Sequence, residues 1–322
     1  MPKVSVVVPN YNHARFLRQR IESVLRQTHR DFEVILLDDC SADESRSILS
    51  EYADDPRVKV EFNEQNSGST FRQWNKGVQL AKGELVWIAE SDDYADKNLL
   101  KRLVAALDSE PGVAFAYCRS WRVSAEDHLD GFADSYLDRR RWTADYCADG
   151  REECRNFFVI CNTIPNASAV LFRKAAYEVV GGADEHLRLC GDWKLWAAMA
   201  LTGRVAYLGE PLNYFRFHGQ SVRDTSGLIL HALESLQVSR WIMNQVAPSD
   251  EAHEKMHVRH AKLWVPALLS AHVPFRMKWQ ILREVRAIDP RPLYHAIRPT
   301  LVTFRLKAAR HLPFLRARVG EL

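Results

Sequence analysis

Apolar runs alternate with amphipathic stretches along the first third of the chain. Residues 4–8 and 32–37 form nearly continuous apolar runs, which are typical of strands covered on both faces of a mostly parallel sheet. Residues 58–62 predict a further strand, and residues 70–82 predict a helix that ends before Gly83. Because strands and helices alternate through short links, we expect an α/β fold of the Rossmann-like kind, a mostly parallel sheet flanked by helices.

An apolar strand predicted at residues 85–89 leads directly into the acidic sequence Glu-Ser-Asp-Asp at 90–93. Two carboxylates about 4 Å apart repel each other by roughly 4 kcal/mol at an effective dielectric near 20, so this sequence requires a cation, a proton or strongly divergent side chains, and a divalent ion is the simplest of the three. Oxygen ligands suit Mg²⁺ or Mn²⁺, and such ions usually complete their shell with water and substrate phosphates. Asp38 and Asp39 end the second predicted strand, so all these acids are expected at the carboxyl edge of the sheet, where doubly wound folds bind ligands.

Two familiar phosphate-binding motifs are absent from the sequence. The turn expected after the first strand reads Pro-Asn-Tyr-Asn at 9–12, without the glycines by which dinucleotide dehydrogenases bring a pyrophosphate close to a helix. No Gly-x-x-x-x-Gly-Lys-Ser/Thr sequence of a P-loop occurs either. We therefore expect the phosphates of a donor to be neutralised by something other than a glycine-rich loop.

Eight short motifs, through their order and spacing, resemble the family 2 glycosyltransferases of the GT-A fold. The resemblance covers about residues 3–222 and implies an enzyme that transfers a sugar from a nucleotide-sugar to a hydroxyl acceptor with inversion at the anomeric carbon. The motifs are Val-Val-Val-Pro-Asn-Tyr-Asn (6–12), Asp-Asp-Cys-Ser (38–41), Asn-Ser-Gly (66–68), Asn-Lys-Gly (75–77), Glu-Ser-Asp-Asp (90–93), Gly-Gly-Ala-Asp-Glu (181–185), Gly-Asp-Trp (191–193) and Phe-Arg-Phe-His (215–218).

The resemblance implies a donor site at the ends of the first strands. Pro9 and Tyr11 match the wall on which the nucleotide base rests, and an aromatic face stacks on a base without selecting it strongly. Asp39 matches the residue that accepts a hydrogen bond from the base imide. Uracil and thymine offer an N–H there and cytosine does not, so UDP or dTDP sugars are favoured. A helix cap or turn before Ser41 is the competing role for Asp38 and Asp39.

Within the acidic sequence, Asp92 and Asp93 match the metal and ribose positions of the family, and we expect both to be ligands of Mg²⁺ or Mn²⁺. Most relatives have aspartate where this chain has Glu90. The additional methylene moves the Glu90 carboxylate outward, so we expect it to support the nucleotide-sugar site from behind the direct contacts. The competing interpretation is a surface turn that caps a helix predicted at residues 97–106.

Asp192 matches the catalytic base of the family, at the start of a helix predicted at residues 193–201. It would take the proton from the acceptor hydroxyl as that oxygen attacks the anomeric carbon. A plain N-cap aspartate is the alternative. Arg216 and His218 resemble an element that closes over the donor diphosphate, although a histidine in an apolar strand can equally be a hydrogen-bonded structural residue.

Composition limits the class of protein. At 322 residues and 47% hydrophobic content, the chain can form one large α/β domain and a smaller second region. No apolar run reaches the roughly 18 residues of a membrane span, and Met-Pro-Lys leads directly into the first strand without a cleavable signal pattern. The six cysteines include no Cys-x-x-Cys pair. We therefore expect a cytoplasmic protein with reduced thiols.

The C-terminal part of the chain differs in charge. Residues 271–322 carry eleven Lys or Arg against three acids, whereas the whole chain has a formal charge of only +3. We place a GT-A domain at 1–222 and a helical, basic region at 223–322, with long helices at 228–244 and 251–271. A basic amphipathic helix at 300–312 fits an anionic membrane surface, but also a solvated face over a packed apolar one.

These observations combine into the hypothesis of a metal-assisted, inverting glycosyltransferase in polysaccharide or glycoconjugate assembly. Its expected partners are a nucleotide-sugar donor, a glycan or lipid-linked sugar acceptor and the inner membrane surface, with no nucleic acid. Two alternatives stay open. A non-catalytic nucleotide-sugar binding module would bind donor without turnover, and a sugar nucleotidyltransferase would need a glycine-rich first loop, which the chain lacks.

Overall fold

The computed structural model describes residues 1–137, 141–218 and 222–297. The chain forms two compact units. The sheet unit comprises residues 1–154 and 162–225, and the helical unit comprises residues 155–161 and the chain from residue 226 onward. The amphipathic helix expected at 300–312 lies outside the described residues.

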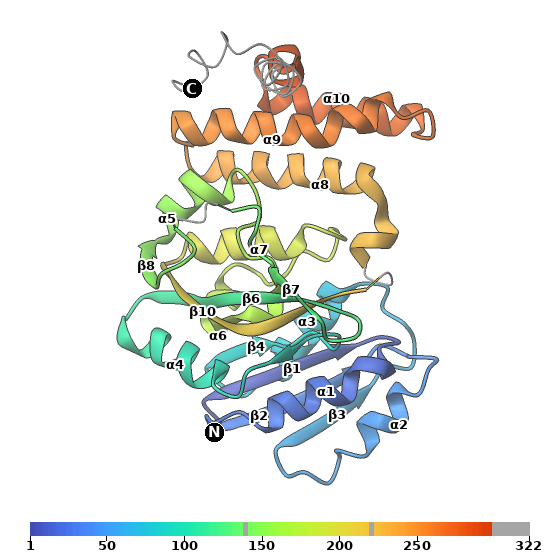
Figure 1. The fold of residues 1–322 in the computed structure, drawn as a ribbon, viewed down its shortest axis with the longest axis vertical. Helices are drawn as coiled ribbons and strands as arrows, with labels where there is room; N and C mark the ends of the chain where they lie inside the picture. Colours follow the sequence, from blue (N-terminus) through green and yellow to red (C-terminus); the bar gives the residue numbers. More distant parts are fainter. Residues whose placement is uncertain (138–140, 219–221, 298–322) are drawn as a thin grey trace. The chain divides into compact units, whose positions relative to one another are not determined.

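The sheet unit is built on ten strands, of which eight follow one another in the order β3-β2-β1-β4-β9-β6-β10-β5 (Figure 1). β1, β2, β3 and β4 pair in parallel, and β10 is parallel to β6. β9 is antiparallel to both its neighbours. The strands are β1 Val4–Asn10, β2 Phe32–Asp38, β3 Val58–Phe62, β4 Leu85–Ile88, β5 Tyr94–Ala95, β6 Val113–Ser124, β7 Leu129–Phe132, β8 Tyr146–Asp149, β9 Val170–Arg173 and β10 Arg204–Phe217.

Seven helices of the described sheet unit complete the α/β fold and confirm the expected fold class. The helix predicted at 70–82 is α3, which packs so closely on β1 that a Cβ at Gly77 would lie 2.2 Å from Val7 Cγ1. The apolar residues of β1, β2 and β4 are buried and form the core together with α1 and α4. The helices are α1 Ala14–Leu25, α2 Ser45–Ser50, α3 Thr70–Leu80, α4 Leu99–Ser109, α5 Gly150–Glu153, α6 Lys174–Val179 and α7 Gly191–Ala200.

The antiparallel strand β9 is a feature that the sequence pattern did not predict. Its register pairs Leu171 with Trp87 and Arg173 with Leu85, so β9 starts beside the carboxyl end of β4. The preceding short helix, Ala167–Ala169, therefore lies at the edge of the sheet that carries the acidic turn. Because the chain enters β9 at the carboxyl edge of the sheet, β9 runs antiparallel to β4.

The described residues of the helical unit form two long helices near the predicted positions, and a third. α8 spans Val222–Gln245, α9 spans Asp250–Leu269 and α10 spans Phe275–Ile288. Ser249 caps α9, because its hydroxyl accepts a hydrogen bond from the amide of Ala252. Apolar side chains of the three helices form a separate core, including Leu236, Ala261, Trp264, Ile281 and Val285.

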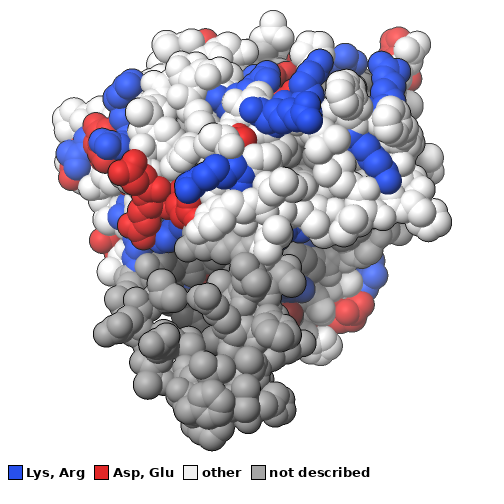
Figure 2. Space-filling model, turned by 90° about the horizontal axis from the view of Figure 1, so that it is seen from above, with Lys and Arg blue, Asp and Glu red and all other residues white. Residues whose placement is uncertain are grey.

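On the face seen in Figure 2, Lys and Arg side chains stand in separate groups, and several Asp and Glu side chains adjoin one another at the left. None of the described helices combines the length and the apolar content that a membrane span requires.

Candidate active site

A cavity of about 1270 Å³ lies at the carboxyl edge of the sheet, beyond β1, β2 and β4. Its wall is built from the turn after β1, the start of α3, the acidic turn after β4 and the loop at 185–188. This is the edge at which doubly wound folds bind ligands. The structure brings together at this cavity six of the residues expected at a nucleotide-sugar site: Pro9, Tyr11, Asp39, Glu90, Asp92 and His218.

The turn after β1 presents an aromatic ring to the cavity. Tyr11 is 48% exposed, although it belongs to a tightly held turn. Asn12 has a positive φ of 57°, its amide donates to Ser41 Oγ at 2.9 Å, and its side-chain oxygen accepts from the amide of Ala42 at 2.8 Å. The turn is therefore fixed to the loop after β2, and Tyr11 offers an open face for stacking.

Asp39 is buried at the cavity wall and is held by four donors. Its Oδ1 accepts hydrogen bonds from Asn63 Nδ2 at 2.6 Å, Gln73 Nε2 at 2.9 Å and the amide of Ser67 at 2.9 Å. Its Oδ2 accepts from Ser67 Oγ at 2.7 Å. A carboxylate oxygen has about two lone-pair sites, so Oδ2 retains acceptor capacity toward the cavity. Asp38 is buried too, but it does not line the cavity. Its carboxylate accepts hydrogen bonds from Asn10 Nδ2 and from the amide of Ser41 within the turn.

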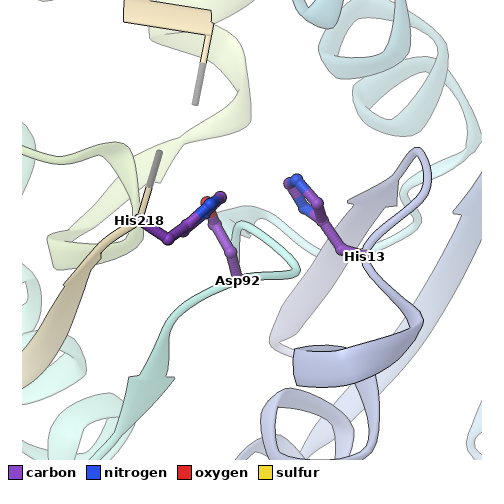
Figure 3. A group of neighbouring side chains, drawn as sticks. All are labelled: His13, Asp92 and His218. Carbon is purple, nitrogen blue, oxygen red and sulfur yellow. The ribbon is translucent and has the colours of Figure 1, made fainter. Parts of the chain in front are cut away.

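Asp92, His13 and His218 form a group that can hold a metal ion (Figure 3). Their ligand atoms all lie within 4.8 Å of one another. His218 Nε2 lies 2.9 Å from Asp92 Oδ2, and His218 Nδ1 is buried without a hydrogen-bond partner among the described residues. The three side chains come from the turn before α1, the turn after β4 and the end of β10, and all three line the cavity. An oxygen ligand between two imidazoles fits a divalent ion, with transition ions such as Mn²⁺ ahead of Mg²⁺.

The protonation states in this group are favourable for a ligand set. Burial disfavours the charge on Asp92, but the hydrogen bond from His218 and the proximity of His13 hold the pKa of Asp92 below its usual value. Burial also lowers the pKa of His13, so this imidazole is neutral near pH 7. Metal ligands must be deprotonated, so neither residue has to release a proton at neutral pH.

Glu90 lies at the cavity wall in a different state. Burial, followed by the charge of Asp92, raises the pKa of Glu90 to about 8. Trp74 Nε1 donates a hydrogen bond to Glu90 Oε1 at 2.7 Å, which fixes the direction of the carboxyl group. A protonated Glu90 can donate a hydrogen bond to a ligand, whereas a cation bound nearby would favour the carboxylate.

Asp93 and Arg216 lie behind the cavity wall rather than at it. Asp93 is 1% exposed, and its oxygens accept from Asn166 Nδ2 at 2.8 Å, Ser168 Oγ at 2.7 Å and the amide of Arg216 at 2.9 Å. The Arg216 guanidinium donates to the backbone oxygen of Asp92 at 2.7 Å and to that of Ser124 at 3.1 Å. The structure therefore does not bring Asp93 into the ligand group or Arg216 to the donor position, and both residues instead fix the acidic turn.

Asp192 lies in the first turn of α7 and is half-buried. Asn162 Nδ2 donates to its Oδ2 at 2.9 Å, and the amide of Trp193 donates to its Oδ1 at 2.7 Å. Steric hindrance explains why the preceding residue 191 is glycine. A Cβ at this position would lie 2.4 Å from the ring of Phe71, a residue of the cavity wall. Asp192 is thus oriented by Asn162 next to the wall, but is not among the described residues that line the cavity.

The sequence did not indicate His13 and Trp74 as residues of the site. His13 follows the end of β1 by three positions, so the predicted strand already implied a place near the carboxyl edge. Trp74 reaches the site from α3. Asn162 opens the stretch 162–168, which resembles the acceptor-side strand of the family, but its contact with Asp192 was not predicted. Their roles depend on side-chain contacts that sequence spacing does not give.

Comparison with known proteins agrees with this geometry. Residues 5–159 match the family model described as glycosyl transferase family 2. The uncharacterized glycosyltransferase alr2836 of Nostoc sp. is 30% identical over 233 residues, which cover 67% of this chain and 65% of that protein. The poly(ribitol-phosphate) β-N-acetylglucosaminyltransferase TarS of Staphylococcus aureus is 36% identical over 110 residues, which cover 34% of this chain and 19% of TarS. The chain thus spans less than two thirds of the length of these relatives.

Solved structures share the fold at low sequence identity. The crystal structure of residues 1–349 of S. aureus TarS has a TM-score of 0.68 and 20% identity, with 99% of this chain and 92% of that chain covered. The mannosyltransferase PcManGT from Pyrobaculum calidifontis, in complex with GDP-Man and Mn²⁺, has a TM-score of 0.59 and 15% identity, with 99% and 83% covered. The chain belongs to the family 2 glycosyltransferases, as the family model and the relative at 30% identity show, and the solved structures show that it has the GT-A fold.

Proposed function

We propose that this chain is an inverting glycosyltransferase that moves a sugar from a nucleotide-sugar to a hydroxyl of a glycan or lipid-linked acceptor. One observation carries the proposal: a single cavity is lined both by a fixed carboxylate suited to a base and by a group suited to a divalent ion. A nucleoside diphosphate sugar needs both, because its base and its diphosphate lie at opposite ends of the nucleotide. The products would enter polysaccharide or glycoconjugate assembly.

The base end of the donor would rest on Pro9 and Tyr11 and would donate its imide N–H to Asp39 Oδ2. The four donors that hold Asp39 keep it in place before a ligand arrives, which lowers the entropy cost of binding. Uracil and thymine carry the required N–H, so UDP or dTDP sugars are favoured. The S. aureus TarS domain has been crystallised with UDP-GlcNAc, which supports UDP as the first candidate.

The diphosphate end would lie at Asp92, His13 and His218, which would hold Mn²⁺ or Mg²⁺. When bound, such an ion supplies stabilisation of the negative charge that develops on the departing diphosphate. His218 is fixed for this position by its contact with Asp92, and Arg216 and Asp93 keep the acidic turn in its conformation. With the ion bound, Glu90 would be a carboxylate and would accept a hydrogen bond from the nucleotide-sugar.

Asp192 is our candidate for the general base. It would accept the proton of the acceptor hydroxyl while that oxygen attacks the anomeric carbon from the face opposite the leaving diphosphate, so the configuration inverts. Asn162 Nδ2, which donates to Oδ2, would keep the carboxylate oriented toward the incoming hydroxyl.

We also propose that the protein works at the inner face of a membrane, where lipid-linked acceptors are found. The described part of the basic region offers α10, on which Phe275 and Trp279 are 82% and 58% exposed. Arg276 and Lys278 lie beside these rings on the same helix. Exposed aromatic and cationic side chains together favour anionic lipid surfaces. Co-sedimentation with anionic but not neutral vesicles would support this location, and equal absence from both would contradict it.

The central experiment is calorimetric titration of the full chain with UDP-GlcNAc, a dTDP-sugar, GDP-mannose and CDP-glucose, each with and without Mn²⁺. We expect UDP or dTDP compounds to bind and to require the ion. Asp192→Asn should retain this binding while turnover falls by about 10²–10⁴-fold, the usual contribution of a general base.

Asp149→Asn is a matched control, because Asp149 is an acid that caps α5 and does not line the cavity. It should change neither binding nor turnover. If folded protein binds no nucleotide-sugar with either ion, the proposal is wrong. If donor binds but Asp192→Asn changes nothing because the parent has no turnover, a binding module replaces the enzyme.

A further inference from the structure

A second group of two histidines and an aspartate lies in the helical unit, separate from the cavity. His257 lies on α9, Asp289 directly follows α10, and His295 lies six residues further along the chain. Their exposed fractions are 2%, 4% and 1%. One nitrogen or oxygen of each residue lies within 4.8 Å of those of the other two. Burial of three such groups together needs a physical reason, because polar side chains lose free energy when they leave water unpaired.

Hydrogen bonds account for one part of this group. His295 Nδ1 lies 2.9 Å and 3.0 Å from the two carboxylate oxygens of Asp289, and His295 Nε2 lies 3.1 Å from Glu254 Oε2. The rings of His295 and His257 stack with their centroids 4.8 Å apart. His295 thus joins α9 to the chain after α10.

No such hydrogen bond in the described part of the chain explains the burial of the Nδ1 nitrogen of His257. His257 Nδ1 is buried and has no hydrogen-bond partner among the described residues. It lies 3.8 Å from Asp289 Oδ2, which is too far for a hydrogen bond. Two ligands of a tetrahedral zinc ion, each about 2.0–2.1 Å from the metal, are separated by roughly 3.3 Å. The gap between His257 and Asp289 therefore lies near the spacing that an ion between them would impose.

The second nitrogen of His257 has a partner on the same helix. Residues 253–257 read His-Glu-Lys-Met-His, which places two histidines four positions apart on one face of α9. His253 Nε2 and His257 Nε2 lie 3.1 Å apart, so one of these nitrogens donates its proton to the other. His253 thus orients the His257 ring and is not one of the three residues that come together.

The charge of the group also suits a metal ion. The carboxylate of Asp289 would supply the negative charge that compensates the ion.

We propose that His257, Asp289 and His295 form a zinc site that ties the end of α10 and the following segment to α9. Two imidazoles and one carboxylate are a ligand set that zinc accepts, and imidazole favours zinc over Mg²⁺ or Ca²⁺. The site is structural, because its three ligands are almost inaccessible to solvent. It is independent of the glycosyltransferase activity proposed above.

Metal analysis of tag-free full chain tests the site. The protein would first be stripped with chelator and reloaded with zinc in an Asp92→Asn background, which removes the carboxylate of the cavity group. We expect about one zinc per chain and a higher Tm in the loaded protein. His257→Gln and His295→Gln should each reduce the zinc content at least tenfold. His260→Gln is the matched control, since His260 is equally buried on α9 but bonds to Ser239 Oγ.

A second measurement covers the case in which the variants unfold. X-ray absorption of the zinc-loaded Asp92→Asn protein should show a nitrogen and oxygen shell with scattering from two imidazoles. Absence of bound zinc in folded protein, unchanged zinc in both variants, or a shell without imidazole would overturn the proposal. The group would then be a hydrogen-bonded network centred on His295.

Discussion

The two units of this chain each gather two imidazoles and one aspartate, but in different surroundings. In the sheet unit the three side chains come from loops at the carboxyl edge and line an open cavity. In the helical unit their counterparts are at most 4% exposed and are set by helices. Catalytic metal sites keep an open position for substrate, whereas structural sites are closed. The same residue types are therefore suited to substrate chemistry in one unit and to stability in the other.

The acids around the two groups differ as well. In the sheet unit, burial raises the pKa of Glu90 to about 8 and that of Asp93 to about 6, and in both cases Asp92 adds to the effect. A cation bound at Asp92 would lower the repulsion among these buried acids. In the helical unit, Asp289 and Glu254 are both within hydrogen-bond distance of His295. The cavity group thus has the stronger electrostatic reason to bind an ion, because several buried acids surround it. The side chains of the buried group are held in place more firmly by hydrogen bonds.

The largest expected effect separates the two groups by function. Asp92→Asn should abolish ion-dependent donor binding and reduce turnover by about 10²–10³-fold, because charge stabilisation at the diphosphate is lost. His257→Gln should leave kcat and KM within about twofold of the parent in folded protein. Steady-state kinetics with a UDP-sugar at saturating Mn²⁺ measures both. Comparable losses in the two variants would mean that the groups do not have separate roles.

A chelator should remove the metal ions of the two groups at different rates. Brief dialysis against EDTA is expected to remove donor binding, and added Mn²⁺ should restore it, because the cavity group is open to solvent. The buried group should release zinc only as the helical unit opens, so its zinc should persist after donor binding has been lost. Parallel measurement of nucleotide binding and zinc content over time tests this difference. Equal rates of loss would contradict the assignment of an open and a closed site.

A smaller effect is expected from the packing behind the cavity. Gly191→Ala would place a methyl group against the Phe71 ring, and such overpacking usually costs about 1–3 kcal/mol. The variant should lower the free energy of unfolding of the sheet unit and weaken turnover, while leaving zinc content unchanged. If Gly191→Ala changes neither the free energy of unfolding nor turnover, the Phe71 ring can move aside without cost.

The smallest expected effect is an opposite response of the two units to pH. Burial raises the pKa of Glu153 from 4.5 to about 7, so its contribution to the stability of the sheet unit is present below pH 4.5 and is lost as the pH rises to 7. Burial lowers the pKa of His260 from 6.5 to about 3, so the unfolded chain takes up a proton first and the helical unit loses stability as the pH falls below 6.5.

Glu153→Gln and His260→Gln should each reduce the pH-dependent change in the free energy of unfolding of the unit concerned by about 1 kcal/mol or more. This corresponds to a Tm change of roughly 2–4 °C. Hydrogen exchange read separately for the two units at pH 5 and pH 7 measures both slopes. Slopes of the same sign in the two units would contradict the expected behaviour.

The sequence was sufficient for the parallel half of the sheet, because β1, β2 and β3 carry the apolar runs of doubly covered strands. It did not predict β9, whose direction depends on where the preceding segment meets β4. Periodicity reports burial along a strand, but not the edge from which the chain enters. The helices α8 and α9 were predicted within a few residues at their carboxyl ends, since their apolar positions recur over many turns.

Prediction of the site succeeded where a residue follows a strand and failed where side-chain direction decides. Asp39 and Asp92 lie at the cavity as expected. Asp93 was expected beside Asp92, but adjacent residues of an irregular turn point in different directions, and Asp93 faces Asn166 and Ser168. His13 was missed because a single histidine at a helix start carries no pattern of its own.

The arrangement around Asp39 has a consequence for engineering of nucleotide preference. An amide at this position would keep its oxygen where Asn63, Gln73 and the Ser67 backbone all donate, so these donors would decide the amide orientation. The amide nitrogen of Asp39→Asn would then point into the cavity and offer a proton where the native chain accepts one. Cytosine presents an acceptor at that edge, so a single substitution should turn a uracil-type reader into a cytosine-type reader.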